Sequence, residues 1–285
     1  MRTGFEWRMM KTEPLDRLRE ILRGMEKIAV AFSGGVDSTF LLYVSRLELE
    51  DGVLALTLNT PLTPAGEMTE ALSLVGEMGV RHLTVSSGIP GGEAFIANPP
   101  DRCYICKKEL FTLLKEKARQ EGFFHLADGT NADDIQDYRP GIRALEELGV
   151  RSPLKEAGLT KAMIRQLSFD LGLRGGERPA SPCLATRIPF GRKIDLNELA
   201  MVARAEKLLR DLGFSECRVR HHGDVARIET TQEMQEKLFR PQVREEILNR
   251  FREIGFPYIT VDLQGYRRGS LNETIDARTG KDGSI

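Results

Sequence analysis

The stretch that begins at Ser33 reads Ser-Gly-Gly-Val-Asp-Ser and has the composition of an anion-binding turn. Gly34 and Gly35 let a phosphate approach the backbone closely, and Ser33 and Ser38 add hydroxyl donors. A carboxylate beside phosphates is repulsive unless a divalent cation lies between them, so we interpret Asp37 as a Mg²⁺ ligand. The pattern is neither a P-loop nor the dinucleotide fingerprint. The alternative is an ordinary turn with an N-capping serine.

Three cysteines have the spacing and setting of metal ligands. Cys103 and Cys106 form a Cys-x-x-Cys pair in an expected loop, and Cys183 lies in a segment rich in Gly, Pro and Arg. Soft thiolates select iron–sulfur clusters, zinc or copper(I), and three of them leave one iron of a cubane cluster open for a hydrosulfide. A structural zinc site and unconnected core cysteines are the alternatives. Cys217 falls inside an expected strand and is interpreted as a core residue.

Alternating strands and helices position these residues. Apolar runs at 27–32, 53–58, 82–85 and 123–127 predict buried strands, and helices are expected at 65–78 and 109–120. This order predicts an α/β fold, a doubly wound parallel sheet with its ligands beyond the carboxyl ends of the strands.

By the same rule, a second loop, at 128–134, shares the site with the Ser33 turn. Gly129 permits close backbone approach there. The carboxylates of this loop could bind a second metal or orient a nucleotide ribose. The alternative is a solvated capping turn. Arg139 follows as a candidate phosphate contact, with a surface arginine as the alternative.

The chain divides into four predicted parts. Residues 1–26 form a lead-in helix, 27–172 the nucleotide domain and 173–194 an interdomain loop. The strands at 217–222, 225–229 and 258–263 and the helices at 197–212 and 242–254 predict a smaller α+β domain over 195–285.

The bulk composition excludes several classes of partner. Forty-one Lys and Arg residues against 42 Asp and Glu residues give a net charge of −1, so no strong field is available to hold nucleic acid. No apolar run approaches the roughly 20 residues that span a bilayer, and no signal-type apolar core is apparent. We therefore expect a cytoplasmic protein with no nucleic-acid or membrane partner.

The Ser33 turn is similar to the pyrophosphate (PP) loop of enzymes that cleave ATP between its α and β phosphates. From about residue 15 to 272 the chain resembles the LarE family, ATP-dependent sulfur transferases of nickel-pincer nucleotide synthesis, which serves lactate racemase maturation. The matching stretches are 31–39, 137–141, 180–191, 218–221 and 261–263.

The resemblance implies an adenine nucleotide alpha hydrolase-like PP-loop domain. It also implies that the carboxylates of pyridinium-3,5-biscarboxylic acid mononucleotide are adenylated and converted to thiocarboxylates. The implied ATP-binding residues are Ala31, Ser33, Gly34, Gly35, Asp37, Ser38, Gly129 and Arg139. The implied substrate-binding residues are Thr186, Arg187, Glu206, Arg218 and Arg220, with Lys107 placed to neutralise the leaving group.

The cysteines indicate which branch of the family the chain resembles. One branch sacrifices a cysteine that aligns with Pro182 here, and carries Trp and Ala at the positions of Cys103 and Cys106. The present sequence resembles the other branch, in which a 4Fe-4S cluster on Cys103, Cys106 and Cys183 carries an additional sulfide. The resemblance also implies a homo-oligomer, such as a hexamer, and does not name the sulfide source.

Three other functions stay open at this point. A tRNA thiolase shares the ATP loop and the three cysteines but predicts a basic RNA-binding surface. An ammonia-using adenylating synthetase needs no cluster. A nucleotide-binding iron–sulfur sensor would release no pyrophosphate.

Overall fold

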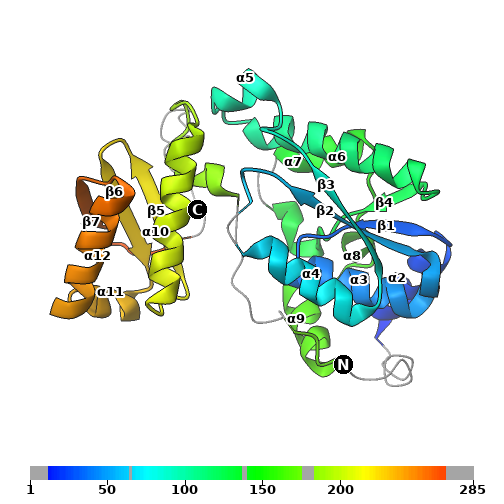
Figure 1. Ribbon diagram of the computed structural model, residues 1–285. Helices are drawn as coiled ribbons and strands as arrows, with labels where there is room; N and C mark the ends of the chain where they lie inside the picture. The colour runs from blue at the N-terminus through cyan, green and yellow to red at the C-terminus, as the bar shows by residue number, and fades with distance from the viewer. Residues whose placement is uncertain (1–11, 64–65, 137–139, 175–182, 268–285) are drawn as a thin grey trace. The chain divides into compact units, whose positions relative to one another are not determined.

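The computed structural model describes residues 12–63, 66–136, 140–174 and 183–267, which form two compact units (Figure 1). The first unit comprises the described parts of Met1–Thr60, Gly66–Gly91 and Cys103–Ala180. The second comprises those of Pro61–Ala65, Gly92–Arg102 and Ser181–Ile285. Two short segments of the range predicted for the nucleotide domain therefore pack with the second unit.

A parallel four-stranded sheet forms the centre of the first unit. Its strands are β1 (Ile28–Ala31), β2 (Val53–Asn59), β3 (Arg81–Ser86) and β4 (His125–Ala127), in the order β3-β2-β1-β4. The chain moves outward from β1 to β3 and then returns to the other side of β1. The sheet is doubly wound, as predicted, and its topological switch point lies between β1 and β4.

Helices cover both faces of this sheet (Figure 1). Ile28 and Val30 of β1 pack into a core with α2, α3, α4, α8 and α9, while Ala29 packs into a core with α6 and α7. This alternation is the period of a strand buried on both sides. The bounds are α2 Glu13–Arg23, α3 Val36–Leu49, η1 Glu50–Gly52, α4 Glu67–Met78, α6 Arg102–Gln120, η2 Ala132–Gln136, α7 Pro140–Glu147, α8 Pro153–Glu156 and α9 Lys161–Asp170.

The second unit is built on a three-stranded sheet with the order β5-β6-β7. Strands β5 (Cys217–His222) and β6 (Val225–Thr230) form the predicted antiparallel hairpin, and β7 (Tyr258–Val261) runs parallel to β6. The other elements are α5 Gly92–Ile96, η3 Leu184–Arg187, α10 Leu196–Asp211, α11 Gln232–Leu238 and α12 Pro241–Ile254. The α+β class predicted for this part of the chain is confirmed.

Helix α6 corrects one prediction. The sequence predicts a helix from residue 109 and a loop before it, but α6 begins at Arg102, so Cys103 and Cys106 lie on a helix. The helix starts directly after Pro99, Pro100 and Asp101, residue types that favour the first turn of a helix, although the Gly/Pro-rich run before them masks this start.

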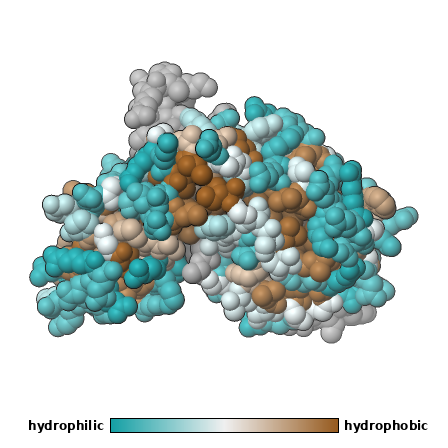
Figure 2. All heavy atoms as spheres, turned by 45° about the horizontal axis from the view of Figure 1, so that its top comes forward, coloured by the Kyte–Doolittle hydropathy of each residue, from teal (hydrophilic) through white to brown (hydrophobic). Residues whose placement is uncertain are grey.

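Hydrophilic side chains dominate the face of the molecule seen in Figure 2, with separate apolar patches between them. No helix in the described part of the chain is both long enough and apolar enough to cross a membrane.

Candidate active-site residues

The Ser33 turn connects the end of β1 to the start of α3. Gly34 has φ 73°, and a Cβ atom there would lie 3.3 Å from Ala71 Cβ. Ser38 Oγ donates to the carbonyl of Gly35 at 3.1 Å and lies 3.1 Å from Ser33 Oγ. The N-cap of α3 is Gly35, and no side-chain cap bonds to the helix start. A serine cap on α3, which the alternative expected, is therefore not found. N–H groups in the first turn of a helix are of the kind that bind an anion.

Asp37 lies in the first turn of α3. One carboxylate oxygen forms an ion pair with the Nζ atom of Lys161, the first residue of α9. The other, Oδ1, is buried and has no hydrogen-bond partner in the described part of the chain. A buried carboxylate oxygen without a partner is costly, and a bound cation would satisfy it. Asp37 therefore fits the role of a Mg²⁺ ligand.

Lys161 is a residue that the sequence analysis missed. Its backbone N–H donates to Asp133 Oδ2 at 2.7 Å, and Thr160 caps the helix by accepting from the N–H of Met163. The loop after β4 thus anchors the start of α9, which in turn delivers the lysine to Asp37. The capping threonine marks the helix start in the sequence, but nothing in the sequence shows where the lysine points.

The loop after β4 packs directly on the Ser33 turn. A Cβ atom on Gly129 would lie 2.9 Å from the backbone nitrogen of Ser38 and 3.3 Å from the carbonyl carbon of Asp37. The close approach expected for Gly129 is therefore real, and its partner in this structure is the backbone of α3.

The carboxylates of the same loop accept hydrogen bonds from protein groups, some inside the loop and some outside it. Asp128 accepts from the hydroxyls of Thr130 and Ser152, and Asp134 accepts from the N–H of Asn131 at 3.1 Å. These bonds favour the capping-turn interpretation over a second metal site. Arg139 lies outside the described residues.

Cys103 and Cys106 lie three residues apart in the first turns of α6, so they share one face of the helix. Cys103 is exposed and Cys106 is half-buried. Lys107 follows them, and its stem is in close contact with α7, because a Cβ atom on Gly141 would lie 2.8 Å from Lys107 Cδ. The positive end of the helix dipole favours thiolates at this position.

Cys183 is the exposed N-cap residue of η3 and belongs to the second unit. The carbonyl of Cys183 accepts two hydrogen bonds from Thr186, one from the backbone N–H at 3.0 Å and one from the side-chain hydroxyl at 2.8 Å. Within the described ranges, no three His, Cys, Asp or Glu side chains form a group that could hold a metal ion. The meeting of Cys183 with Cys103 and Cys106 stays a prediction.

Cys217 is the buried cysteine, in the first position of β5. Burial is the main cause that raises the pKa of its thiol to about 12. A thiol held neutral in this way is a poor metal ligand, so Cys217 is a core residue, as expected.

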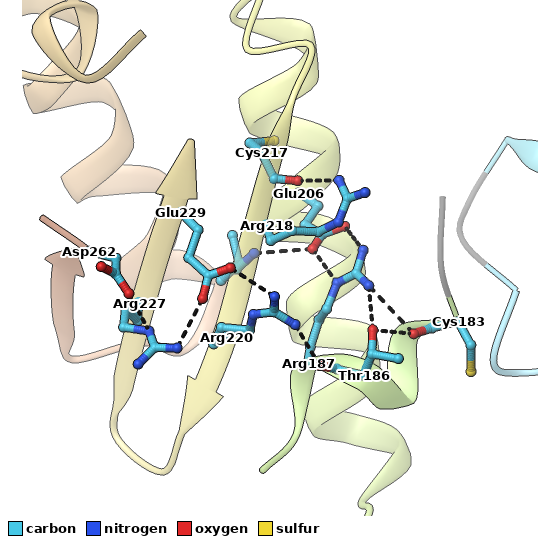
Figure 3. Close-up of polar contacts among 11 residues, drawn as sticks. Cys183, Thr186, Arg187, Glu206, Cys217, Arg218, Arg220, Arg227, Glu229 and Asp262 are labelled. Carbon is cyan, nitrogen blue, oxygen red and sulfur yellow. Dashed lines mark hydrogen bonds and ion pairs between the residues drawn. The ribbon is translucent and has the colours of Figure 1, made fainter. Parts of the chain in front are cut away.

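Arg187 and Glu206 form a buried ion pair (Figure 3). Each side chain is 1% exposed, and the two bonds are 2.7 Å from Nε to Oε1 and 3.0 Å from Nη2 to Oε2. Glu206 Oε1 also accepts from the N–H of Val219 at 3.1 Å. The pair therefore ties η3 to α10 and β5. Arg187 further donates to Thr186 Oγ1 at 2.7 Å.

Arg218 and Arg220 stand two residues apart on β5 and so share one face of the strand. Arg220 donates to the carbonyl of Thr186 at 2.7 Å and to Glu229 Oε2 at 2.8 Å. Arg218 donates to the carbonyl of Cys217 and lies 5.0 Å from the centre of the Tyr266 ring. Burial, and then the charge of Arg187, lower the pKa of Arg218. Glu229 was missed, because nothing in the sequence shows which carboxylate faces β5.

Hydrogen bonds join four of the five implied substrate-binding residues in one network of the second unit: Thr186, Arg187, Glu206 and Arg220. The fifth, Arg218, is near enough for the charges of Arg187 and Glu206 to affect its pKa. The residues implied for ATP gather in the first unit around the start of α3, except Arg139, which is not described.

Comparison with known proteins gives the following relatives. No family model matches the chain. The chain is 38% identical over 266 residues to the uncharacterized protein slr1717 of Synechocystis sp., covering 93% of this chain and 99% of that protein. It is 35% identical over 257 residues to the pyridinium-3,5-bisthiocarboxylic acid mononucleotide synthase of Lactiplantibacillus plantarum, covering 89% of this chain and 92% of that protein. A shorter match, 25% over 177 residues, is to one subunit of the glutamine-hydrolyzing GMP synthase of Methanoculleus marisnigri, covering 59% of this chain and 55% of that subunit.

Proposed function

The chain belongs to the LarE family of pyridinium-3,5-bisthiocarboxylic acid mononucleotide synthases, and we propose that it makes this product from the corresponding biscarboxylate. It is an ATP-utilising enzyme of the PP-loop type. For each carboxylate, one ATP and one hydrosulfide give a thiocarboxylate, AMP and pyrophosphate. The product serves the synthesis of a nickel-pincer nucleotide.

The proposed first step is adenylation at the Ser33 turn. A substrate carboxylate oxygen attacks the α phosphorus of ATP, the bond from that phosphorus to the bridging oxygen breaks, and pyrophosphate leaves. The N–H groups of α3 hold the phosphates, and Asp37 holds Mg²⁺ through its buried oxygen. Lys161 and Lys107 supply positive charge for the pyrophosphate or the acyl-adenylate. The single observation that carries this step is the unpartnered Oδ1 atom of Asp37.

The network around Arg187 is proposed to hold the substrate nucleotide. Arg218 and Arg220 carry their guanidinium groups on one face of β5. A planar guanidinium group can form bidentate hydrogen bonds with a carboxylate or a phosphate. Arg187 lies deeper, with 1% of its side chain exposed, so it supports this face through Thr186.

The sulfur is proposed to come from a 4Fe-4S cluster on Cys103, Cys106 and Cys183. The donor set fits, because two of these thiols are exposed, two share a helix face, and the remaining cysteine of the chain is a neutral core thiol. When bound, such a cluster keeps one iron open and supplies hydrosulfide as the nucleophile. The chain's own residues place the thiols at a helix start and at the N-cap of η3.

The test uses protein purified without oxygen and supplied with the biscarboxylate nucleotide, ATP, Mg²⁺ and sulfide. We expect iron bound to the chain, more than one turnover per chain, and AMP and thiocarboxylate in equal amounts. Cys103→Ala should abolish thiocarboxylate formation and leave pyrophosphate release measurable, whereas Cys217→Ala should affect neither.

Three outcomes would contradict the proposal. Iron-free protein that turns over once and carries dehydroalanine at Cys183 would show sacrificial chemistry. Amide formation with ammonium by the Cys103→Ala/Cys183→Ala variant would show an amidating synthetase. Retention of total tRNA on a filter at physiological salt, with thiolated tRNA as product, would show a tRNA thiolase.

A further inference from the structure

The segment that follows β7 makes a tight turn and stays attached to β6. The N–H of Asp262 donates to the carbonyl of Ile228 at 2.9 Å, which continues the pairing of β7 with β6. The N–H of Gly265 donates to the carbonyl of Asp262 at 3.0 Å and closes the turn. The N–H of Tyr266 then donates to the carbonyl of Thr230 at 2.9 Å. The turn from Asp262 to Tyr266, called the β7 turn below, is therefore fixed to β6 at both ends.

Gly265 permits this close attachment. Its φ is 71°, in the left-handed region that favours glycine, and a Cβ atom on it would lie 2.7 Å from the carbonyl oxygen of Thr230. Real Cβ atoms essentially never come so close to another heavy atom, so any other residue would push the turn away from β6. Gln235 Nε2 also holds the turn by donating to the carbonyl of Asp262 at 3.1 Å. The position of Tyr266 thus depends on a glycine at its neighbour.

The β7 turn reaches the charged face of the sheet in the second unit. The strand register pairs Arg218 with Glu229 and Arg220 with Arg227, so these four side chains share one face. Glu229 accepts from Arg220 at 2.8 Å and from Arg227 at 2.9 Å (Figure 3). Arg227 Nε lies 3.5 Å from Asp262 Oδ2. A chain of ion pairs therefore connects the β7 turn to Arg220.

The ring of Tyr266 is the second contact of the β7 turn with this face. The guanidinium carbon of Arg218 lies 5.0 Å from the ring centre, a distance at which a cation and an aromatic face attract each other. Arg218 is 6% exposed and Tyr266 is half-buried, so water weakens this attraction little. An arginine side chain has many rotamers, and a ring beside its planar group restricts where that group points.

We propose that Tyr266 is a positioning residue that orients the guanidinium group of Arg218 for the substrate nucleotide. The inference rests on the proposed function only for what Arg218 binds, since the orientation is measurable without substrate. Tyr266 does not act on the reacting atoms. Its ring holds Arg218 on the face that Arg220 shares, so that a phosphate or carboxylate meets donors that are already ordered and binds more tightly.

The test uses two ways of disturbing the contact, each with a matched control. Tyr266→Leu removes the ring, whereas Tyr266→Phe keeps it. Gly265→Ala keeps both partners of the contact but displaces the turn. Tyr258→Leu is the control for the ring, because it removes a 63% exposed ring from β7 in the same unit. Gly223→Ala is the control for the glycine, because its φ is 73° and an added Cβ atom would meet nothing within 4 Å.

The first readout is the rate at which phenylglyoxal modifies Arg218 in ligand-free protein, measured by peptide mass spectrometry. Phenylglyoxal condenses with guanidinium groups, so the rate reports how often this group leaves its buried position. We expect the rate to rise about fivefold in Tyr266→Leu and at least as much in Gly265→Ala, as the loss of a buried cation–ring contact implies. Tyr266→Phe, Tyr258→Leu and Gly223→Ala should keep the wild-type rate.

The second readout is the affinity for the biscarboxylate nucleotide, measured by calorimetry without ATP and by steady-state kinetics. Kd and KM should rise about fivefold in Tyr266→Leu, while kcat stays within about twofold of wild type, because the ring acts on binding and not on the reacting atoms. Tyr266→Phe should restore both constants. In wild type the nucleotide should also protect Arg218 from phenylglyoxal.

The outcomes separate this inference from the proposed function. Equal modification rates of Arg218 in Tyr266→Leu and wild type would overturn the inference, and so would an unchanged Kd in Tyr266→Leu when wild type binds the nucleotide. The expected modification rates in a protein that does not bind the nucleotide would overturn the proposed substrate and leave the positioning role intact. If Tyr266→Leu does not fold, Gly265→Ala decides alone, and a rate equal to that of Gly223→Ala would refute the inference.

Discussion

We propose that the Ser33 turn and the arginine network around Arg187 both bind negatively charged groups, but the two are built in opposite ways. The turn uses backbone N–H groups, small side chains and one carboxylate with an unpartnered oxygen. The network uses long cationic side chains, and Arg187 and Glu206 satisfy each other in the interior. The turn therefore has a polar atom that a ligand could satisfy, whereas ion pairs within the protein neutralise part of the network's charge.

The difference predicts where mutational effects appear. A substitution in the turn should reduce catalysis with little effect on folding, because few protein contacts depend on its polar atoms. A substitution at the buried pair should destabilise the second unit, because a charge left alone in the interior is costly.

Glu206→Gln should have the largest effect. It removes the charge that balances Arg187, so we expect the free energy of unfolding of the second unit to fall by about 3–5 kcal/mol. Urea unfolding monitored in that unit measures the loss. Asp211→Asn is the matched control on the same helix, because its pair with Lys207 is about 60% exposed on both sides and should contribute little. Equal stabilities of the two variants would contradict the buried-pair interpretation.

Asp37→Asn should lower the rate of pyrophosphate release by about 10²–10³-fold and leave the unfolding midpoint nearly unchanged. The reason is that an amide does not hold Mg²⁺ as a carboxylate does. The rate is measured with saturating substrate over a Mg²⁺ titration. Asp133→Asn is the control, since an amide oxygen can still accept from the N–H of Lys161, and its rate should stay within about threefold of wild type.

Gly129→Ala should be next in size. The added Cβ atom would lie 2.9 Å from Ser38 N, so the loop or α3 must shift, at an expected cost of about 1–3 kcal/mol and with weaker ATP binding. Calorimetry of unfolding and ATP titration measure both effects. Gly76→Ala, inside α4 with open space around it, should instead stabilise the protein by about 0.5–1 kcal/mol. Destabilisation by both variants would contradict this prediction.

The thiol of Cys217 should change the pH dependence of stability only at high pH. Burial raises the pKa of its thiol from 9.0 to about 12, so above pH 9 the unfolded chain loses a proton that the folded chain keeps. Stability should therefore fall between pH 9 and pH 12, by at most about 1.4 kcal/mol per pH unit from this group. Cys217→Ala should unfold with a correspondingly weaker pH dependence over that window. An unchanged slope would show that the thiol ionises in the folded state.

The main elements of the fold follow from local patterns in the sequence. The apolar runs before Ser33 and at 53–58 are continuous, as in strands buried on both faces, and Gly34 marks the turn between strand and helix. The start of α6 could not be predicted from the same signals, because the glycines and prolines before it suggest a longer loop.

The candidate site was only partly predictable, for a physical reason. The types and spacing of residues 33–38 are enough to predict a phosphate-binding turn, since backbone N–H groups at a helix start need no distant partner.

Tertiary structure alone decided which long side chains face each other, namely Lys161 with Asp37, Arg187 with Glu206, and Asn98 with the turn after η3. These contacts join residues 19 to 124 positions apart, and a linear pattern carries no information on which segments the packed core brings together.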